Sequence, residues 1–252
     1  MSSETSSTVT AAVLVIGDEI LSGRTKEKNS GHIADTLIQI GIDLREIRVV
    51  PDVEAEIVNA LNALRARYDY VFTTGGIGPT HDDITADAVA AALGVGIDHD
   101  PRAVAMLKER YAEEELNEAR LRMARIPFGA DLIENPISKA PGFRIANVIV
   151  MAGVPSIMQR MLDNVLPTLR TGRRMIVETI DAGPGVGEGM FGTELAAIAA
   201  SHPSVSIGSY PSFDASGFRT SLVVRGKDAE AVALAREAVA AMIVRIRATL
   251  IA

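Results

Sequence analysis

The chain has 252 residues, 48% of them hydrophobic and 23% charged, with no cysteine, no tryptophan and a formal net charge of −7. This length fits one large domain or a medium domain with a small one, and the core must rest on aliphatic side chains. Because the chain has no cysteine, it has no disulfides, thiolate metal ligands or cysteine nucleophile. The net negative charge disfavours nonspecific electrostatic binding to nucleic acid. No apolar run reaches the roughly 18 residues of a membrane span. We therefore predict a cytoplasmic protein with neither nucleic acid nor membrane as a partner.

The first ten residues, MSSETSSTVT, are polar and lack the basic-then-apolar order of a secretory signal. Such a segment buries too little apolar surface to order itself. We predict a disordered leader over residues 1–10, with the organised chain beginning at residue 11.

Residues 11–170 alternate apolar runs of strand length with segments whose apolar residues recur at helical spacing. Strands are predicted at 12–16, 44–50, 70–73 and 147–151. The intervening helices are predicted to start at Asn29 and Ser30 as caps, at Asp52, and at 85–93, with further helices at 101–116 and from Pro155 to about 169. This β-α-β-α-β-α order indicates an α/β domain with a mostly parallel sheet and right-handed crossovers.

The pattern changes after Thr171 and Gly172. Strands are predicted at 174–180, 205–210 and 218–225, and helices at 188–200 and 228–248. Their β-α-β-β-α order indicates a small α+β domain of the ferredoxin-like kind over residues 171–252.

The loop at 73–83, TTGGIGPTHDD, follows a predicted strand. Ligands of parallel α/β sheets bind beyond the carboxyl ends of the strands, and glycines there let backbone N–H groups approach a phosphate. The phosphate-binding residues predicted from this loop are Thr73, Thr74, Gly75, Gly76, Gly78, Pro79 and Thr80. The adjacent carboxylates of Asp82 and Asp83 would repel each other unless a divalent cation bridges them or one is protonated. The alternative is a glycine-rich turn in which Asp83 caps the next helix.

Other loops at the same edge carry further candidates. Asp18 and Glu19 follow the first strand and can bind a metal or orient water, although each alone is more typical of a solvated loop charge. Asp52 serves equally well as a helix cap, and Lys139 lies in a constrained loop from which it could reach a phosphate. His81 is the one histidine placed in the glycine-rich loop, where a solvated imidazole is the alternative. The sequence GxGxxG is absent after the first strand, which disfavours a Rossmann dehydrogenase.

Three motifs together resemble the N-terminal domain of the competence/damage-inducible protein A family: GDEILSG at 17–23, Asn29, and TGGIGPTHDD at 74–83. Further matches are at 117–120, 127–130, Asn135, 140–142 and 153–155, so the resemblance covers roughly residues 11–170. It implies a three-layer α/β/α fold like that of molybdopterin-binding enzymes. Residues 172–250 resemble the small domain that follows in these proteins and in eukaryotic FAD synthases. We expect neither the deamidase domain of full-length relatives nor the adenylyl-transfer domain of FAD synthases.

The resemblance implies a nucleotide or pterin ligand, because relatives bind molybdopterin or nucleotides and some are metal-dependent pyrophosphatases of ADP-ribose or FAD. The functional aspartates of the molybdenum cofactor enzymes match Asp52 and Asp83. The leading hypothesis is a pyrophosphohydrolase in which Glu19, Asp82 and Asp83 hold Mg²⁺, Mn²⁺ or Co²⁺ and Lys139 assists the leaving phosphate. The predicted ligand-binding set is completed by Gly17, Asn29, Gly153 and Pro155. A homodimer or homotrimer is expected, as in proteins of this fold.

Two alternatives remain open. One is a molybdopterin-binding protein of molybdenum cofactor biosynthesis that holds the pterin phosphate on the same loops. The other is a ligand-sensing module without catalysis, suggested by the residues Asp18, Ala152 and Ile157, which depart from the family pattern.

Overall fold

A computed structural model describes residues 8–214 and 217–251 of the chain. It divides into two compact units, Met1–Gly172 and Arg173–Ala252, so the division lies two residues beyond the predicted one. The predicted leader is too long, because Val9 and Thr10 already belong to the first strand, where Val9 is fully buried. Residues 1–7 of that leader lie outside the described part of the chain.

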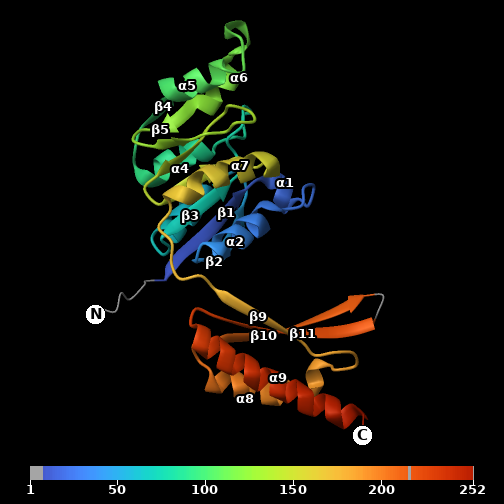
Figure 1. Cartoon of the computed structure of the whole chain (residues 1–252). Coiled ribbons are helices and arrows are strands. Elements are labelled where there is room, and N and C mark those ends of the chain that lie inside the picture. The colour runs from blue at the N-terminus through green and yellow to red at the C-terminus, as the bar shows by residue number, and fades with distance from the viewer. Residues whose placement is uncertain (1–7, 215–216, 252) are drawn as a thin grey trace, which may run out of the picture. The chain divides into compact units, whose positions relative to one another are not determined.

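The first unit is built on a six-stranded sheet in the order β2-β1-β3-β8-β7-β6. Figure 1 labels three of its strands, β1, β2 and β3. The strands of this sheet are β1 (Val9–Ile16), β2 (Ile42–Val50), β3 (Tyr70–Thr74), β6 (Asp131–Ile133), β7 (Gly142–Ile145) and β8 (Val148–Met151). The first four in spatial order pair in parallel, whereas β7 and β6 are antiparallel. The burial of β3 along its whole length explains why its sequence is continuously apolar up to its terminal threonines.

Helices cover both faces of this sheet and make three layers. They are α1 (Asp18–Leu21), α2 (Asn29–Gln39), α3 (Glu54–Arg65), α4 (Thr85–Leu93), α5 (Pro101–Lys108), α6 (Glu118–Leu121) and α7 (Pro155–Val165), with β4 (Ile97–His99) and β5 (Arg125–Pro127) forming a small ribbon. Ile33 of α2 and Met161 of α7 share one core cluster, and Leu61 of α3 and Val89 of α4 share the other. The three-layer α/β/α prediction is confirmed, and none of the helices in the described ranges is both long and apolar enough to span a membrane.

Several predicted helix starts are wrong, because the capping residues have other partners. Asn29 lies inside α2, whose first N–H groups at Asn29 and Ser30 donate to the carboxylate of Glu27 at 2.7 and 3.0 Å. Asp52 and Asp83 precede helices that begin at Glu54 and Thr85, and neither is the cap residue.

The helix predicted at 101–116 is also too long, since α5 ends at Lys108. Residues Glu113–Glu115 form a separate 3-10 turn. Three consecutive carboxylates would stand at the negative end of a longer helix, which disfavours its extension.

The second unit is a three-stranded antiparallel sheet in the order β10-β11-β9 with two helices. Its elements are β9 (Ile176–Asp181), α8 (Gly192–Ser201), β10 (Ser206–Asp214), β11 (Gly217–Gly226) and α9 (Ala229–Ile251). Leu222 and Val224 on β11 pack with Val239 and Met242 of α9 in one core. The small α+β domain is confirmed, although the helix predicted from 188 begins at Gly192 after a 3-10 turn.

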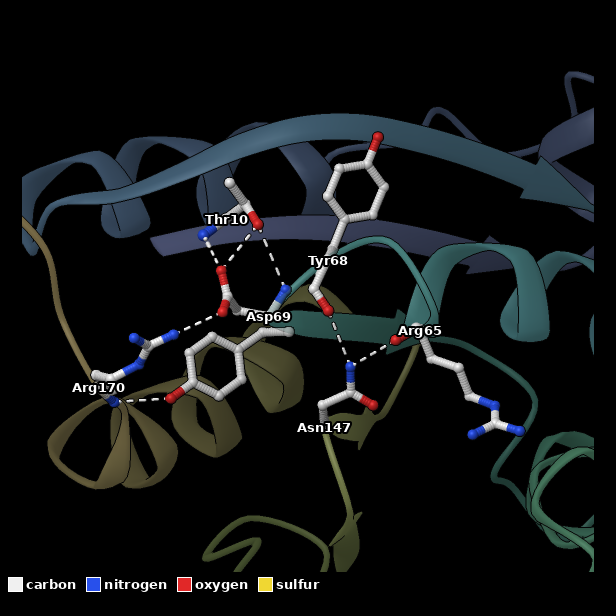
Figure 2. Close-up of polar contacts among 7 residues, drawn as sticks. Thr10, Arg65, Tyr68, Asp69, Asn147 and Arg170 are labelled. Carbon is white, nitrogen blue, oxygen red and sulfur yellow. Dashed lines mark hydrogen bonds and ion pairs between the residues drawn. The ribbon is translucent and has the colours of Figure 1, made fainter. Parts of the chain in front are cut away.

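Polar side chains tie together the amino ends of the parallel strands in the first unit (Figure 2). The Asp69 carboxylate accepts hydrogen bonds from the Thr10 N–H at 2.8 Å and from the Thr10 hydroxyl at 2.9 Å, and it pairs with Arg170 at 2.5 Å. The Arg170 N–H donates to the Tyr70 hydroxyl at 2.7 Å. These contacts hold the start of β1, the start of β3 and the segment after α7 together.

Asn147 makes a similar contact at the amino end of β8, the neighbour of β3 in the sheet (Figure 2). Its side-chain amide donates to the carbonyls of Arg65 and Tyr68 at 3.0 and 2.9 Å. The end of α3 is thereby fixed to the start of β8.

Candidate functional site

The carboxyl ends of the parallel strands bring the predicted loops side by side. Strand pairing places Ile16 next to Val50, and Thr74 between Val15 and Met151. The segments that follow these residues therefore leave the sheet from one edge, as the sequence predicted.

A pocket of about 350 Å³ opens at this edge, and we call it the Asn29 pocket. The predicted site residues that line it are Glu19, Asn29, Thr74, Gly75, Gly153 and Pro155. Lys26 and Lys28 also line it. The sequence analysis missed both lysines, although the alternating charges of KEK just before Asn29 are visible in the sequence.

Asn29 joins the loops around its pocket and keeps one atom without a partner. Its amide donates to the Gly153 carbonyl at 2.8 Å and to the Thr74 hydroxyl at 3.4 Å. Its Oδ1 is buried and finds no hydrogen-bond partner in the described ranges, and the same holds for the hydroxyl of Thr73. A buried polar atom without a partner costs about 1–3 kcal/mol. A ligand that donates a hydrogen bond would remove that penalty at Asn29.

The glycines of the loop serve first the packing of the chain itself. Gly75 has φ 105°, and a side chain there would run into the backbone carbonyl of Ile16. Gly76 has φ 67°, and a side chain there would meet the Thr85 hydroxyl, which donates to the Gly75 carbonyl at 2.9 Å. These positive φ values need glycine. The turn can therefore lie directly against the last residue of β1 and the first residue of α4.

Carboxylates crowd around Asp52. Burial raises the pKa of Asp52 above its usual value, and the charges on Asp18, Glu19 and Asp82 raise it further. The hydrogen bond from the Asp18 N–H at 2.9 Å opposes this rise without cancelling it. The Asp18–Asp52 hydrogen bond joins the segment after β1 to the segment after β2, which the sequence could not establish.

Asp83 is held by Thr80. It accepts hydrogen bonds from the Thr80 N–H at 2.8 Å and from the Thr80 hydroxyl. The pKa of Asp82 is lowered by the nearby Thr80 hydroxyl and by its own backbone N–H, although the hydrogen bond of that hydroxyl goes to Asp83. Pro79, Thr80 and His81 are exposed, and the imidazole of His81 lies in solvent.

The predicted metal site is not preformed. Across residues 8–214 and 217–251, no three acidic, histidine or cysteine side chains come close enough together to hold an ion. The predicted set of Glu19, Asp82 and Asp83 is not assembled as a cage, since Asp83 is turned toward Thr80. The oxygen donors suit Mg²⁺ or Mn²⁺, but further ligands would have to come from water or a substrate.

The prediction for Lys139 finds no support in its contacts. Its ammonium lies 2.6 Å from Glu109 and 4.0 Å from Glu134, and Glu109 raises its pKa. It lines neither of the pockets described here. The two carboxylates account for its orientation.

A second pocket, of about 340 Å³, borders the glycine turn at Gly76, and we call it the arginine pocket. Asp83, Asp87, Arg122 and Arg125 line it with Ile77, Met123 and Phe143. The sequence analysis missed both arginines. Their signal is the run RLRMAR at 120–125, which ends at the first residue of β5.

Comparison with known proteins agrees with this geometry. Residues 12–171 match the family described as "Probable molybdopterin binding domain", and residues 178–248 match "FAD synthase, middle domain". A CinA-like protein of Citrifermentans bemidjiense is 46% identical over 170 residues, which cover 64% of this chain and 41% of that relative. A probable FAD synthase of Caenorhabditis briggsae is 31% identical over an alignment that covers 93% of this chain and 50% of that relative. The chain thus spans half or less of the length of these two relatives.

The fold of the first unit also matches a solved structure. The crystal structure of a CinA protein of unknown function from Thermoplasma acidophilum superposes with a TM-score of 0.61 at 36% identity, covering 64% of this chain and 99% of the other. The family match extends over most of the chain and includes every loop of the candidate site. The chain therefore belongs to the molybdopterin-binding-domain family and is CinA-like, with a following segment that matches the FAD synthase middle domain.

Proposed function

We propose that the chain is a divalent-metal-dependent pyrophosphohydrolase of ADP-ribose-like dinucleotides. The observation that carries this proposal is the position of Asp52, whose carboxylate accepts a hydrogen bond from the Asp18 N–H at 2.9 Å and whose pKa is raised by burial and by the charges of Asp18, Glu19 and Asp82. Ionised carboxylates that repel one another favour a bound cation, and perturbed carboxylates gather at catalytic sites more often than elsewhere. The relationship to CinA-like proteins and to an FAD synthase supports a nucleotide-related substrate.

Residues of the chain have distinct parts in this proposal. Lys26 and Lys28 at the Asn29 pocket attract an anionic ligand, and Asn29 orients it through its free Oδ1. Within the Gly75–Thr80 backbone, the N–H groups of Gly76, Ile77 and Gly78 are proposed to stabilise charge on the phosphoryl oxygens, because the Gly75 and Thr80 N–H groups already donate to Met151 and Asp83. Asp52 takes the proton of the attacking water, because a carboxylate with a raised pKa accepts a proton more readily.

Glu19, Asp82 and Asp83 are the residues proposed to hold the cation. Mg²⁺ typically binds to one or two carboxylates together with substrate phosphates and water, so it needs no complete cage in the protein. When bound, such an ion polarises the pyrophosphate and lowers the pKa of its water. We therefore expect weak metal binding by the protein alone and tighter binding with the nucleotide present.

The test is hydrolysis of ADP-ribose and FAD with Mg²⁺, Mn²⁺ or Co²⁺, comparing the wild type with Asp83→Asn. We expect metal-dependent turnover that falls about 100-fold or more in the variant. The matched control is Asp163→Asn on α7, whose carboxylate is exposed and pairs with Arg160 at 3.7 Å. Equal turnover in the wild type and Asp83→Asn would refute the assigned role of Asp83, and no turnover with any metal would refute the enzyme.

A second candidate is a molybdopterin-binding protein. The observation that favours it is the unpartnered Oδ1 of Asn29, because the amide and amino groups of a pterin are hydrogen-bond donors. A fluorescent pterin that co-purifies with the wild type and is lost in Asn29→Ala would support it. Tight ADP-ribose binding without any pterin binding would remove it.

The non-catalytic sensing module stands as a third proposal, with weaker support. Ala152 and Ile157 are partly buried and pack against the core, so their departures from the family pattern are explained by packing. Measured turnover of any dinucleotide would exclude this proposal. The dimer or trimer stays a prediction, which sedimentation of the full chain would test.

A further inference from the structure

The arginine pocket contains one cation whose charge no carboxylate balances. Arg125 forms an ion pair with Asp87, so these two side chains neutralise each other. The Asp83 carboxylate faces Thr80. Arg122 remains: it forms no ion pair within residues 8–214 and 217–251, and its guanidinium donates a hydrogen bond to the backbone carbonyl of Asp83 at 3.3 Å.

The guanidinium of Arg122 has more N–H groups than it has hydrogen-bond acceptors around it. A guanidinium carries five N–H groups, and its Nε here is buried without a hydrogen-bond partner among the described residues. The side chain is only partly exposed, so water cannot satisfy it fully. A partly buried cation of this kind calls for an anionic acceptor.

The surroundings strengthen this demand. Ile77, Met123 and Phe143 form apolar walls of the pocket. Apolar walls reduce screening, so a charge pair inside them is worth more than one in open solvent. The hydrogen bond to the Asp83 carbonyl also fixes the guanidinium beside the loop that carries Asp82 and Asp83.

The location relates this pocket to the Asn29 pocket. Gly75 lines the Asn29 pocket and Gly76 lines the arginine pocket, so the glycine turn stands between them. Ile126 and Phe143 belong to the core on one face of the sheet, whereas Val15 and Ile20 at the Asn29 pocket belong to the core on the other. A ligand lying across the turn would reach both pockets.

We propose that Arg122 binds one phosphate of a ligand that lies across the Gly75–Gly76 turn, with its remaining polar groups in the Asn29 pocket. The planar guanidinium fork matches phosphate oxygens in two parallel hydrogen bonds, which a lysine cannot reproduce. The identity of the ligand as a dinucleotide rests on the proposed function, whereas the anion site itself does not. The arrangement favours a diphosphate over a monophosphate, because the turn takes one phosphate and Arg122 the other.

The test is calorimetric titration of the full chain with ADP-ribose, AMP and inorganic pyrophosphate, without a metal that supports turnover. We expect Arg122→Gln to weaken ADP-ribose and pyrophosphate binding about tenfold or more, and Arg122→Lys to restore only part of it. The control is Arg45→Gln on β2, an exposed arginine paired with Asp43 at 2.8 Å, which should change affinity less than twofold. Thermal unfolding of each variant separates lost binding from lost folding.

The outcomes distinguish this inference from the proposed function. Pyrophosphate binding that depends on Arg122, without dinucleotide hydrolysis, would support the anion site and refute the proposed pyrophosphohydrolase activity. Hydrolysis and binding that survive Arg122→Gln unchanged would overturn the anion site and leave the hydrolase standing. A wild type that binds none of the three ligands would overturn the anion site, and the turnover assay with added metal would then decide the hydrolase separately.

Discussion

In the first unit, the polar side chains at the amino ends of the parallel strands are hydrogen-bonded, whereas several at the carboxyl ends have unpartnered atoms or like-charged neighbours. At the amino ends, Asp69 and Asn147 bond to neighbouring segments (Figure 2). At the carboxyl ends, Asn29 and Arg122 each keep a buried polar atom without a partner, and Asp52 lies among like charges. Satisfied polar groups stabilise a fold, while unsatisfied ones lower its stability unless a ligand completes them. The comparison predicts that one edge serves mainly stability and that the other binds a ligand.

The largest effect that this comparison predicts is at Asp52. Asp52→Asn should lower kcat/KM for ADP-ribose by about 100-fold or more, because it removes the proposed proton acceptor. The variant should be more stable than the wild type at high pH. Because folding raises the pKa of Asp52, the wild type loses stability as the pH rises through the folded-state pKa and Asp52 ionises, and an asparagine avoids this loss. Urea unfolding at pH 5 and pH 8 measures this, with the gain expected at pH 8. A variant that is both inactive and less stable at pH 8 would place Asp52 among the structural residues.

The next effect belongs to the amino edge. Asn147→Ala should lower the free energy of unfolding by about 1–3 kcal/mol, because the carbonyls of Arg65 and Tyr68 lose their donor. Turnover per folded molecule should not change. Asn164→Ala is the matched control, because Asn164 donates to the Glu134 carbonyl at 3.0 Å from an exposed position. If Asn147→Ala abolished turnover in folded protein, the division between the two edges would fail.

Asn29→Ala tests the carboxyl edge by affinity. Loss of the orienting amide should weaken ADP-ribose binding about tenfold, which corresponds to about 1.4 kcal/mol. Stability should change less than in Asn147→Ala, since the variant also removes an unpartnered buried Oδ1. Titration calorimetry and urea unfolding measure the two quantities. Equal affinity in wild type and Asn29→Ala would remove this residue from the site.

The smallest effect is the acid sensitivity of the amino edge. Burial pulls the pKa of Asp69 upward, but Thr10 and Arg170 outweigh it and hold this pKa below its usual value. A carboxyl whose pKa is lowered by folding stabilises the fold above its unfolded-state pKa of about 4, and this contribution is lost as the pH falls through the folded-state pKa. Asp69→Asn should therefore flatten the loss of stability below about pH 4 by less than about 1 kcal/mol. An unchanged pH profile would show that the Asp69 pair contributes nothing measurable.

The fold was largely predictable from local patterns. The apolar runs at β1, β3 and β8 and the helical spacing between the strands indicate a parallel three-layer unit, because strands that bury both faces need helices on each side of the sheet. The motif TGGIGPTHDD identified the family through its own residues. Cap positions were less predictable, since Asn29 and Asp52 have tertiary partners that compete with the local capping role.

By itself, the sequence determined the parallel strands β1, β2, β3 and β8, the glycine turn, and the residue types that meet at the carboxyl edge, whereas the short strands β4, β5, β6 and β7 were not predicted. Only the tertiary structure decided which of them are in contact. Asn29 donates hydrogen bonds to Gly153 and Thr74. Lys139 pairs with Glu109, and Arg122 donates to the backbone carbonyl of Asp83. The physical reason is that periodicity and turn chemistry are local, whereas desolvation and charge pairing depend on segments tens of residues apart.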